Sequence, residues 1–140
     1  MMKPLQILSE KYVRMHQEST GGPEIDANGN KIWRNANGQY HRLDGPAVIK
    51  ADGTKGWYVN GKRHRLDGPA IEWADGDKLW YVNGELHRLD GPAIEYADGT
   101  KAWYIDDKQY TEKGFNKYVQ ALKDRQDILN KDNPGIEMDI

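Results

Sequence analysis

The sequence predicts a mainly β fold, an elongated single-layer antiparallel meander of tandem β-hairpins with a helix at each end. Three observations predict it. The stretch His-Arg-Leu-Asp-Gly-Pro-Ala begins at His41, at His64 and again at His87, each time 23 residues further on. A Trp-Tyr pair keeps the same period, and each unit carries Asn-Gly and Asp-Gly turn signals. A fixed period with two turns per unit indicates stacked hairpin repeats.

The turn dipeptides set the limits of the strands. Asn60-Gly61 and Asn83-Gly84 suit a type I′ hairpin turn, which needs positive φ at both central residues. Asp75-Gly76 and Asp98-Gly99 predict a second turn of the same kind. Between them lie short β-rich runs such as residues 79–82. Each unit is therefore predicted to form a two-stranded antiparallel ribbon, and successive ribbons are predicted to pair edge to edge.

Strand alternation predicts an aromatic ladder on each face of this sheet. Trp80 and Val82 should face one side, and Leu79 and Tyr81 the other. The prolines of the repeated stretch cannot donate to a strand ladder, so they are expected at a bulge or at the start of a strand. Trp33 begins the series one residue out of phase, because the segment 35–38 carries one extra residue before its glycine.

The chain divides into four predicted segments. Residues 1–22 form an N-terminal helical cap, 23–110 the repeat array, 111–130 a C-terminal helix, and 131–140 a flexible tail. Thr111 is the expected N-cap of the second helix, whose apolar stripe begins at Phe115. Helices at both ends would cover the open edges that an array of strands leaves.

Composition limits the classes of function. The 140 residues carry a net charge of −2 and no cysteine, which excludes disulfides and thiolate chemistry and leaves no field for strong nucleic-acid binding. No apolar stretch is long enough to span a membrane. The N-terminus lacks the pattern of a secretory signal, so a cytoplasmic protein is expected.

The repeated histidines invite a metal or catalytic hypothesis, and geometry argues against it. Equivalent residues of neighbouring hairpins should lie two strand spacings apart, roughly 10 Å. Zinc needs all its ligands at about 2.0–2.2 Å. Within one unit, His64 and Asp67 could meet, but no nucleophile stands beside them. We therefore predict no catalytic residue, no metal and no cofactor.

A structural role for the repeated polar residues is the favoured interpretation. The Asp67 carboxylate is expected to accept backbone N–H bonds in the turn that Gly68 closes. Arg65 would pair with Asp67 or with its counterpart in the next unit, and His64 would fill a half-buried slot with one ring nitrogen bonded. The residues assigned to these structural turns are Asp44, Gly45, Asp67, Gly68, Asp90 and Gly91.

Aromatic and arginine side chains are the candidates for contact with a partner, because Trp, Tyr and Arg dominate binding hot spots. The competing interpretation is cross-strand packing within the sheet. The C-terminal helix is either a cap or an element that docks into a partner groove, and a homodimer through a sheet edge or a helix is a further option. The candidate contact residues are Tyr58, Tyr81, Tyr104, Arg42, Arg63, Arg65, Arg88 and Trp73.

Two stretches, residues 58–64 and 74–76, resemble the MORN repeat, with a resemblance that covers about Glu24 to Tyr110. Residues 65–69 replace the usual Gly-x-Gly of that repeat. The variant with His-Arg-x-Asp-Gly-Pro-Ala and a following Thr-Glu-x-x-Phe helix, here Thr111 to Phe115, is similar to proteins of phages and large viruses. The resemblance implies a single-layer hairpin array used for protein or membrane-surface contacts, and it implies no chemistry.

The sequence thus predicts a non-enzymatic protein-binding module, a phage or viral protein that binds or inhibits a host protein in the host-cell cytoplasm. The contact would use an aromatic and Arg-bearing face of the array. One alternative is a repeat protein that binds a small ligand, glycan or nucleotide, because Trp-Tyr-x-Asn-Gly is similar to aromatic cell-wall-binding repeats. The other alternative is a membrane-surface tether.

Overall fold

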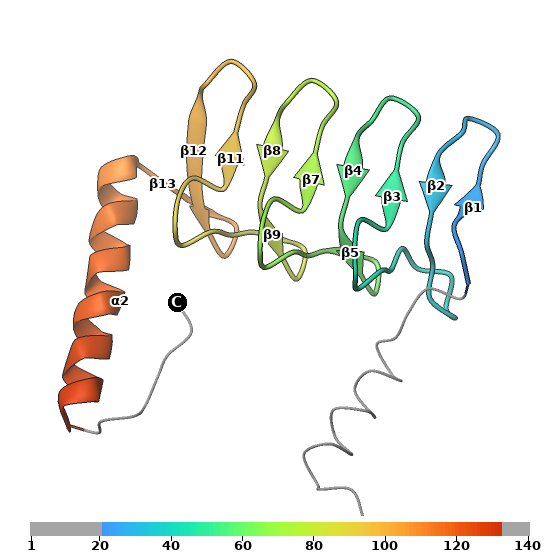
Figure 1. Ribbon diagram of the computed structural model, residues 1–140. Helices are drawn as coiled ribbons and strands as arrows, with labels where there is room; N and C mark the ends of the chain where they lie inside the picture. Colours follow the sequence, from blue (N-terminus) through green and yellow to red (C-terminus); the bar gives the residue numbers. More distant parts are fainter. Residues whose placement is uncertain (1–20, 133–140) are drawn as a thin grey trace, which may run out of the picture.

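The computed structural model describes residues 21–132, which form one long antiparallel sheet with a helix at its C-terminal end (Figure 1). The sheet is a meander in chain order, as predicted. Its nine strands are β1 (Glu24–Ile25), β2 (Lys31–Ile32), β3 (Val48–Ile49), β4 (Lys55–Gly56), β7 (Ile71–Glu72), β8 (Lys78–Leu79), β11 (Ile94–Glu95), β12 (Lys101–Ile105) and β13 (Lys108–Tyr110).

Each unit makes two hairpins where we predicted one ribbon. The upper hairpin, for example β7–β8, belongs to the long sheet, and a small hairpin follows at the lower edge of the array (Figure 1). The small hairpins are β5 (Tyr58–Val59) with β6 (Lys62–Arg63), and β9 (Tyr81–Val82) with β10 (Glu85–Leu86). The Asn-Gly dipeptide closes the small hairpin and the Asp-Gly dipeptide closes the upper one, so one repeat contains both.

Two rows of side chains cross the sheet on opposite faces. One row is apolar and includes the buried Ile32, Ile71 and Ile94. The adjacent row alternates in charge, and neighbours such as Lys55 and Glu72 are direct cross-strand partners. Opposite charges placed across strands stabilise a sheet. The full charged row is Lys55, Glu72, Lys78, Glu95 and Lys101.

The lower turns confirm the prediction of type I′ geometry. Asn60 and Gly61 have φ of 49° and 81°, and Asn83 and Gly84 have φ of 51° and 84°. The corresponding turn of the last unit uses Asp106 and Asp107, both with positive φ. Asn and Asp adopt this left-handed conformation more readily than other side chains.

The upper turns differ from the prediction. At Asp75-Gly76 only the glycine has positive φ, 103°, so the turn is not type I′. Gly76 N donates to Trp73 O at 2.9 Å, and Trp73 N donates to Asp77 O at 2.9 Å, which is a type I turn followed by a left-handed glycine. The Asp75 carboxylate holds this geometry because it accepts a bond from Asp77 N at 3.0 Å.

The extra residue of the first unit has a structural explanation. Asn35 N donates to Gln39 O at 2.9 Å, and Gly38 N donates to Asn35 O at 3.0 Å. The lower turn of this unit is therefore the three-residue kind found at the upper tips. One residue more is needed than in an Asn-Gly turn, which puts Trp33 out of phase.

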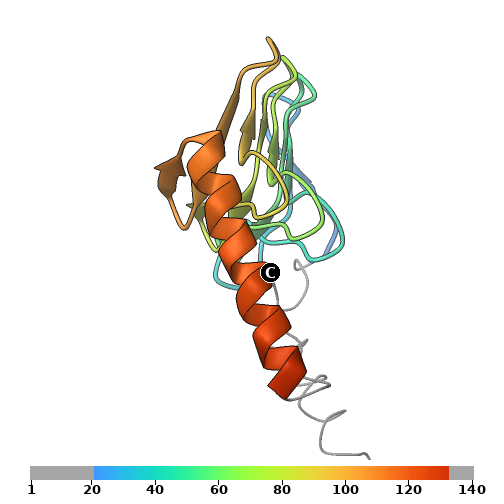
Figure 2. The same cartoon turned by 90° about the vertical axis from the view of Figure 1, so that its left-hand side faces the viewer.

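The helix α2 (Glu112–Asp132) lies against β12 and β13 at the end of the array, and its C-terminal half extends past the small hairpins (Figure 1 and Figure 2). Thr111 is its N-cap, as predicted, because Gly114 N donates to Thr111 Oγ1 at 3.0 Å. The helix ends two residues beyond the predicted limit. The rest of the predicted tail lies outside the described residues, as does the predicted N-terminal cap apart from Gly21 and Gly22.

Candidate functional site

The arginines of the repeated stretch are held inside the array by an arrangement we name the arginine clamp. The Arg65 guanidinium lies 3.9 Å from the centroid of the Trp57 ring. Its Nε donates to Asp67 Oδ1 at 3.0 Å, and its terminal nitrogen donates to Pro69 O at 3.0 Å. A planar guanidinium can bond at its edge while its face stacks on an aromatic ring. The same clamp holds Arg42 on Trp33 and Arg88 on Trp80.

The clamp corrects the reason we gave for the aspartates. The Asp67 carboxylate accepts its hydrogen bond from the Arg65 side chain and not from the turn backbone that we expected. Of the two pairings left open for Arg65, the structure shows the one within its own unit. A hydrogen bond between a guanidinium and a carboxylate, which are both charged, is stronger than one from a neutral amide. At Asp44 the hydrogen bond from Arg42, with its positive charge, lowers the carboxyl pKa.

The clamp leaves no room for a Cβ at its glycine unless the arginine moves. A Cβ added to Gly68 would lie 2.8 Å from Cζ of Arg65. Gly68 is not among the residues with positive φ, so the turn itself does not demand glycine there. Gly45 and Gly91 stand in the same relation to Arg42 and Arg88, with distances of 2.9 and 2.8 Å. These glycines let the backbone lie against the guanidinium.

The repeated histidines link each unit to the next one. Nδ1 of His64 accepts a bond from Asn83 N at 3.0 Å, across 19 residues. His41 and His87 accept equivalent bonds from Asn60 N and Asp106 N at 2.9 and 3.2 Å. An imidazole nitrogen accepts only when it carries no proton. Burial lowers the pKa of His64, which favours that neutral form.

The candidate tyrosines lie half-buried on the face opposite the tryptophans. The Tyr58 and Tyr81 hydroxyls both face Arg63, whose nitrogens donate to them at 3.5 and 3.3 Å. Tyr104 occupies the equivalent position in the last unit and is also half-buried. Each of these tyrosines therefore packs in part against its neighbours and is in part exposed to solvent.

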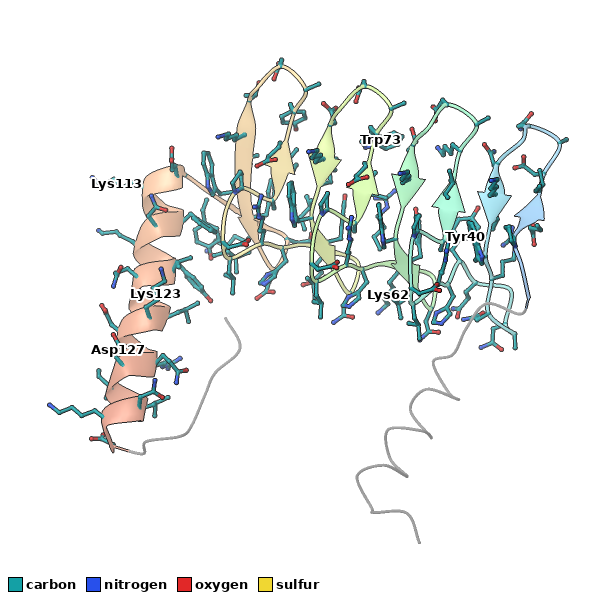
Figure 3. All side chains as sticks on the ribbon, in the orientation of Figure 1. Tyr40, Lys62, Trp73, Lys113, Lys123 and Asp127 are labelled. Carbon is teal, nitrogen blue, oxygen red and sulfur yellow. The ribbon has the colours of Figure 1, made fainter. Side chains whose placement is uncertain are left out.

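Two aromatic side chains at the upper hairpin tips are exposed to solvent. Trp73 is 40% exposed, and Figure 3 shows it beside the β7–β8 tip, at the opposite edge of the array from Lys62. Tyr96, which is 43% exposed, is the equivalent residue of the next unit. Sequence reasoning selected Trp73 and missed Tyr96, although the 23-residue period relates the two.

The recurrent loops (residues 41–46, 64–69 and 87–92) form the walls of a groove that occurs twice. In the first groove, loops 41–46 and 64–69 stand on either side of a floor made by Trp57 and Val59. In the second groove every lining residue is shifted by one repeat, so that Trp80 and Val82 form the floor. Val119 and Lys123 of α2 close one side of the second groove, and no residue of α2 lines the first.

Leucines stand at the rims of these grooves. Leu43 is 48% exposed and Leu66 is 80% exposed, whereas Leu89, beside α2, is half-buried. Sequence reasoning missed these residues. The available signal was a single large apolar side chain within each charged loop, which a structural turn does not need.

Within residues 21–132 no three His, Asp or Glu side chains are grouped closely enough to hold a metal ion. In the same part of the chain no helix has the length and apolar character needed to cross a bilayer. Comparison with protein-family models, with curated proteins and with solved structures gave no match.

Proposed function

We propose that this chain is a non-enzymatic protein-binding module whose contact surface is the loop face, defined as the recurrent loops with Leu43 and Leu66 and the grooves between them. The observation that carries the proposal is the set of apolar side chains in the first groove, where the exposed Leu43 and Leu66 lie beside Trp57 and Val59. Apolar side chains gathered on one face favour contact with a partner, because exposed apolar patches usually mark interaction sites.

The clamp supplies the rigidity that such a surface needs. The side chains of Arg65 and Asp67 are bonded to each other, and the Arg65 ring contact is with Trp57. These clamped side chains have little conformational freedom left to lose when a partner binds, which lowers the entropic cost of association. In this proposal the candidate arginines Arg42, Arg65 and Arg88 order the surface, and the leucines and the Trp57 floor make the contacts.

The narrowest form of the proposal is a phage or viral protein that binds a host protein in the cytoplasm. That form is supported by the resemblance of the repeated stretch alone. The general form is supported by the exposure of the loop leucines, and it holds for a partner of any origin.

The proposal is tested with the full chain as bait in a lysate of the cells in which the protein naturally occurs, with captured proteins quantified by mass spectrometry. Leu66→Asp should remove the specifically captured protein. Trp73→Ala, a change of an exposed apolar residue outside the loop face, should retain it. Capture that depends on Trp73 and not on Leu66, or no specific capture, would contradict the proposal.

A second candidate function is binding of a glycan or another ring-stacking ligand at the hairpin tips. Trp73 and Tyr96 are 40% and 43% exposed on adjacent upper hairpins, which places them roughly 10 Å apart. Tryptophan fluorescence titrated with glycans, choline and nucleotides tests it. A saturable change that Trp73→Ala abolishes supports this function, and a flat response rejects it.

A further inference from the structure

We propose that the first groove binds an amphipathic helix of a partner protein, one that carries an aliphatic residue followed four positions later by Lys or Arg. The inference rests on the proposed function and deepens it, because it names the class of ligand and the place on the loop face where the ligand binds.

The second groove shows which side chains of a helix lie beside such a surface in this chain. It is the first groove moved by one repeat, with each lining residue replaced by its equivalent. Its side is closed by Val119 and Lys123, which are four residues apart and so lie on one face of α2. The chain therefore already places an aliphatic residue and a lysine of a helix beside one copy of this groove. The first groove repeats this lining one unit toward the N-terminus, and no residue of α2 lies along it.

The charges of the first groove match a basic ligand. Its floor is Trp57 and Val59, which suits an aliphatic side chain. The side chains of Asp44 and Asp67 at its rims are 87% and 88% exposed, while the arginines beside them are only 24% and 22% exposed. The negative ends of these ion pairs thus point outward. A Lys or Arg on the bound helix would meet a carboxylate there, as in electrostatically matched interfaces.

The backbone of the groove favours a helix over an added strand. Its walls are loops, and their Arg42 and Arg65 amides already donate to Tyr58 O and Tyr81 O at 3.1 Å each. Addition of a strand depends on free backbone groups along an edge. The groove instead offers side chains, which is how an amphipathic helix is recognised.

The experiment uses the full chain and a labelled alanine-based helical peptide that carries Val-Gln-Ala-Leu-Lys, the sequence of residues 119–123. Fluorescence anisotropy should show saturable binding. Leu43→Ser, a change at an exposed residue that lines only the first groove, should weaken binding about tenfold or more, a loss of about 1.4 kcal/mol. Trp73→Ala should leave it unchanged. A control peptide with serine in place of its Val and Leu should not bind.

Backbone amide shifts in NMR spectra provide a second readout that does not depend on a variant. The shifts should concentrate at Leu43, Val59 and Leu66. No saturable binding up to about 1 mM, or shifts centred on the hairpin tips, would overturn the inference. So would a dimer of the full chain that Leu43→Ser dissociates, because the occupant would then be a second copy. If Leu66→Asp abolishes protein capture while the peptide does not bind, the proposed function stands and this inference fails.

Discussion

The side chain that orders each repeat is the clamped arginine. Arg65 contacts a ring, a carboxylate and a carbonyl at once, and its terminal nitrogen also lies 3.6 Å from Glu72 Oε1 in the charged row of the sheet. A stacked guanidinium contributes roughly 0.5–2 kcal/mol from the ring alone. Three copies of this contact fix three loops that otherwise contain little secondary structure.

The close approach of Gly68 to this guanidinium gives a first prediction. Gly68→Ala should destabilise the chain by about 1–3 kcal/mol, because a Cβ 2.8 Å from Cζ of Arg65 forces the clamped side chain to move. Urea unfolding measures the change. In an Arg65→Ala background the same substitution should cost much less. An equal cost in both backgrounds would show that the guanidinium is not the cause.

The histidine links give a pH prediction. Burial holds the folded-state pKa of His64 below its usual value of 6.5, so the unfolded chain binds this proton more tightly. The contribution of His64 to stability is complete above about pH 6.5 and decreases as the pH falls below that value. Urea unfolding at pH 7.5 and 5.0 should show a smaller loss in His64→Gln than in the parent chain. An equal loss would mean that His64 does not take part.

At the scale of the element, the turns decide where each hairpin closes. Asn83 has φ of 51°, a conformation that costs an alanine about 1 kcal/mol and costs a glycine nothing comparable. Asn83→Ala should therefore lower the free energy of unfolding by about that amount. Asn83→Gly should change it by less, which thermal or urea unfolding of both variants will show. Equal losses of unfolding free energy in the two variants would mean that contacts of the Asn83 side chain, and not its backbone φ, stabilise the turn.

Features decided by residues next to each other in the sequence were predicted more accurately than features that depend on other contacts. The Asn-Gly turns were predictable because φ is decided within two residues. The prediction of a type I′ turn at Asp75-Gly76 was wrong. The Asp75 carboxylate accepts a hydrogen bond from Asp77 N, and this bond favours a different turn type. The 23-residue period predicted the meander, since each unit has the same neighbours.

The candidate site was less predictable. Choosing Arg65 as a contact residue followed hot-spot composition, whereas its role depends on Trp57, which the fold brings beneath it from eight residues away. Leu66 was missed for the same reason. Its exposure results from the clamp, which uses the residues on either side of it. Which residues of one loop form the scaffold and which form the surface can be seen only in the three-dimensional structure.

For the whole molecule, α2 takes the place that another repeat would occupy. Phe115 of α2 is 4% exposed, and α2 contacts β12 and β13. Phe115→Ala should destabilise the chain by about 3 kcal/mol, because its removal leaves a cavity at the capped end. Ile128→Ala, at a residue that is 62% exposed, should change stability by less than about 0.5 kcal/mol. Thermal unfolding of the two variants compares them, and similar losses would contradict a capping role.

Each recurrent loop divides its residues between the scaffold and the surface. Equilibrium urea unfolding of Arg65→Ala and of Leu66→Ala distinguishes the two roles. We predict a loss of at least about 1 kcal/mol for Arg65→Ala, from the lost ring contact and hydrogen bonds, and less than about 0.5 kcal/mol for Leu66→Ala. A larger loss of unfolding free energy for Leu66→Ala than for Arg65→Ala would contradict this division of roles. The exposed leucine would then stabilise the fold, and the clamped arginine would not.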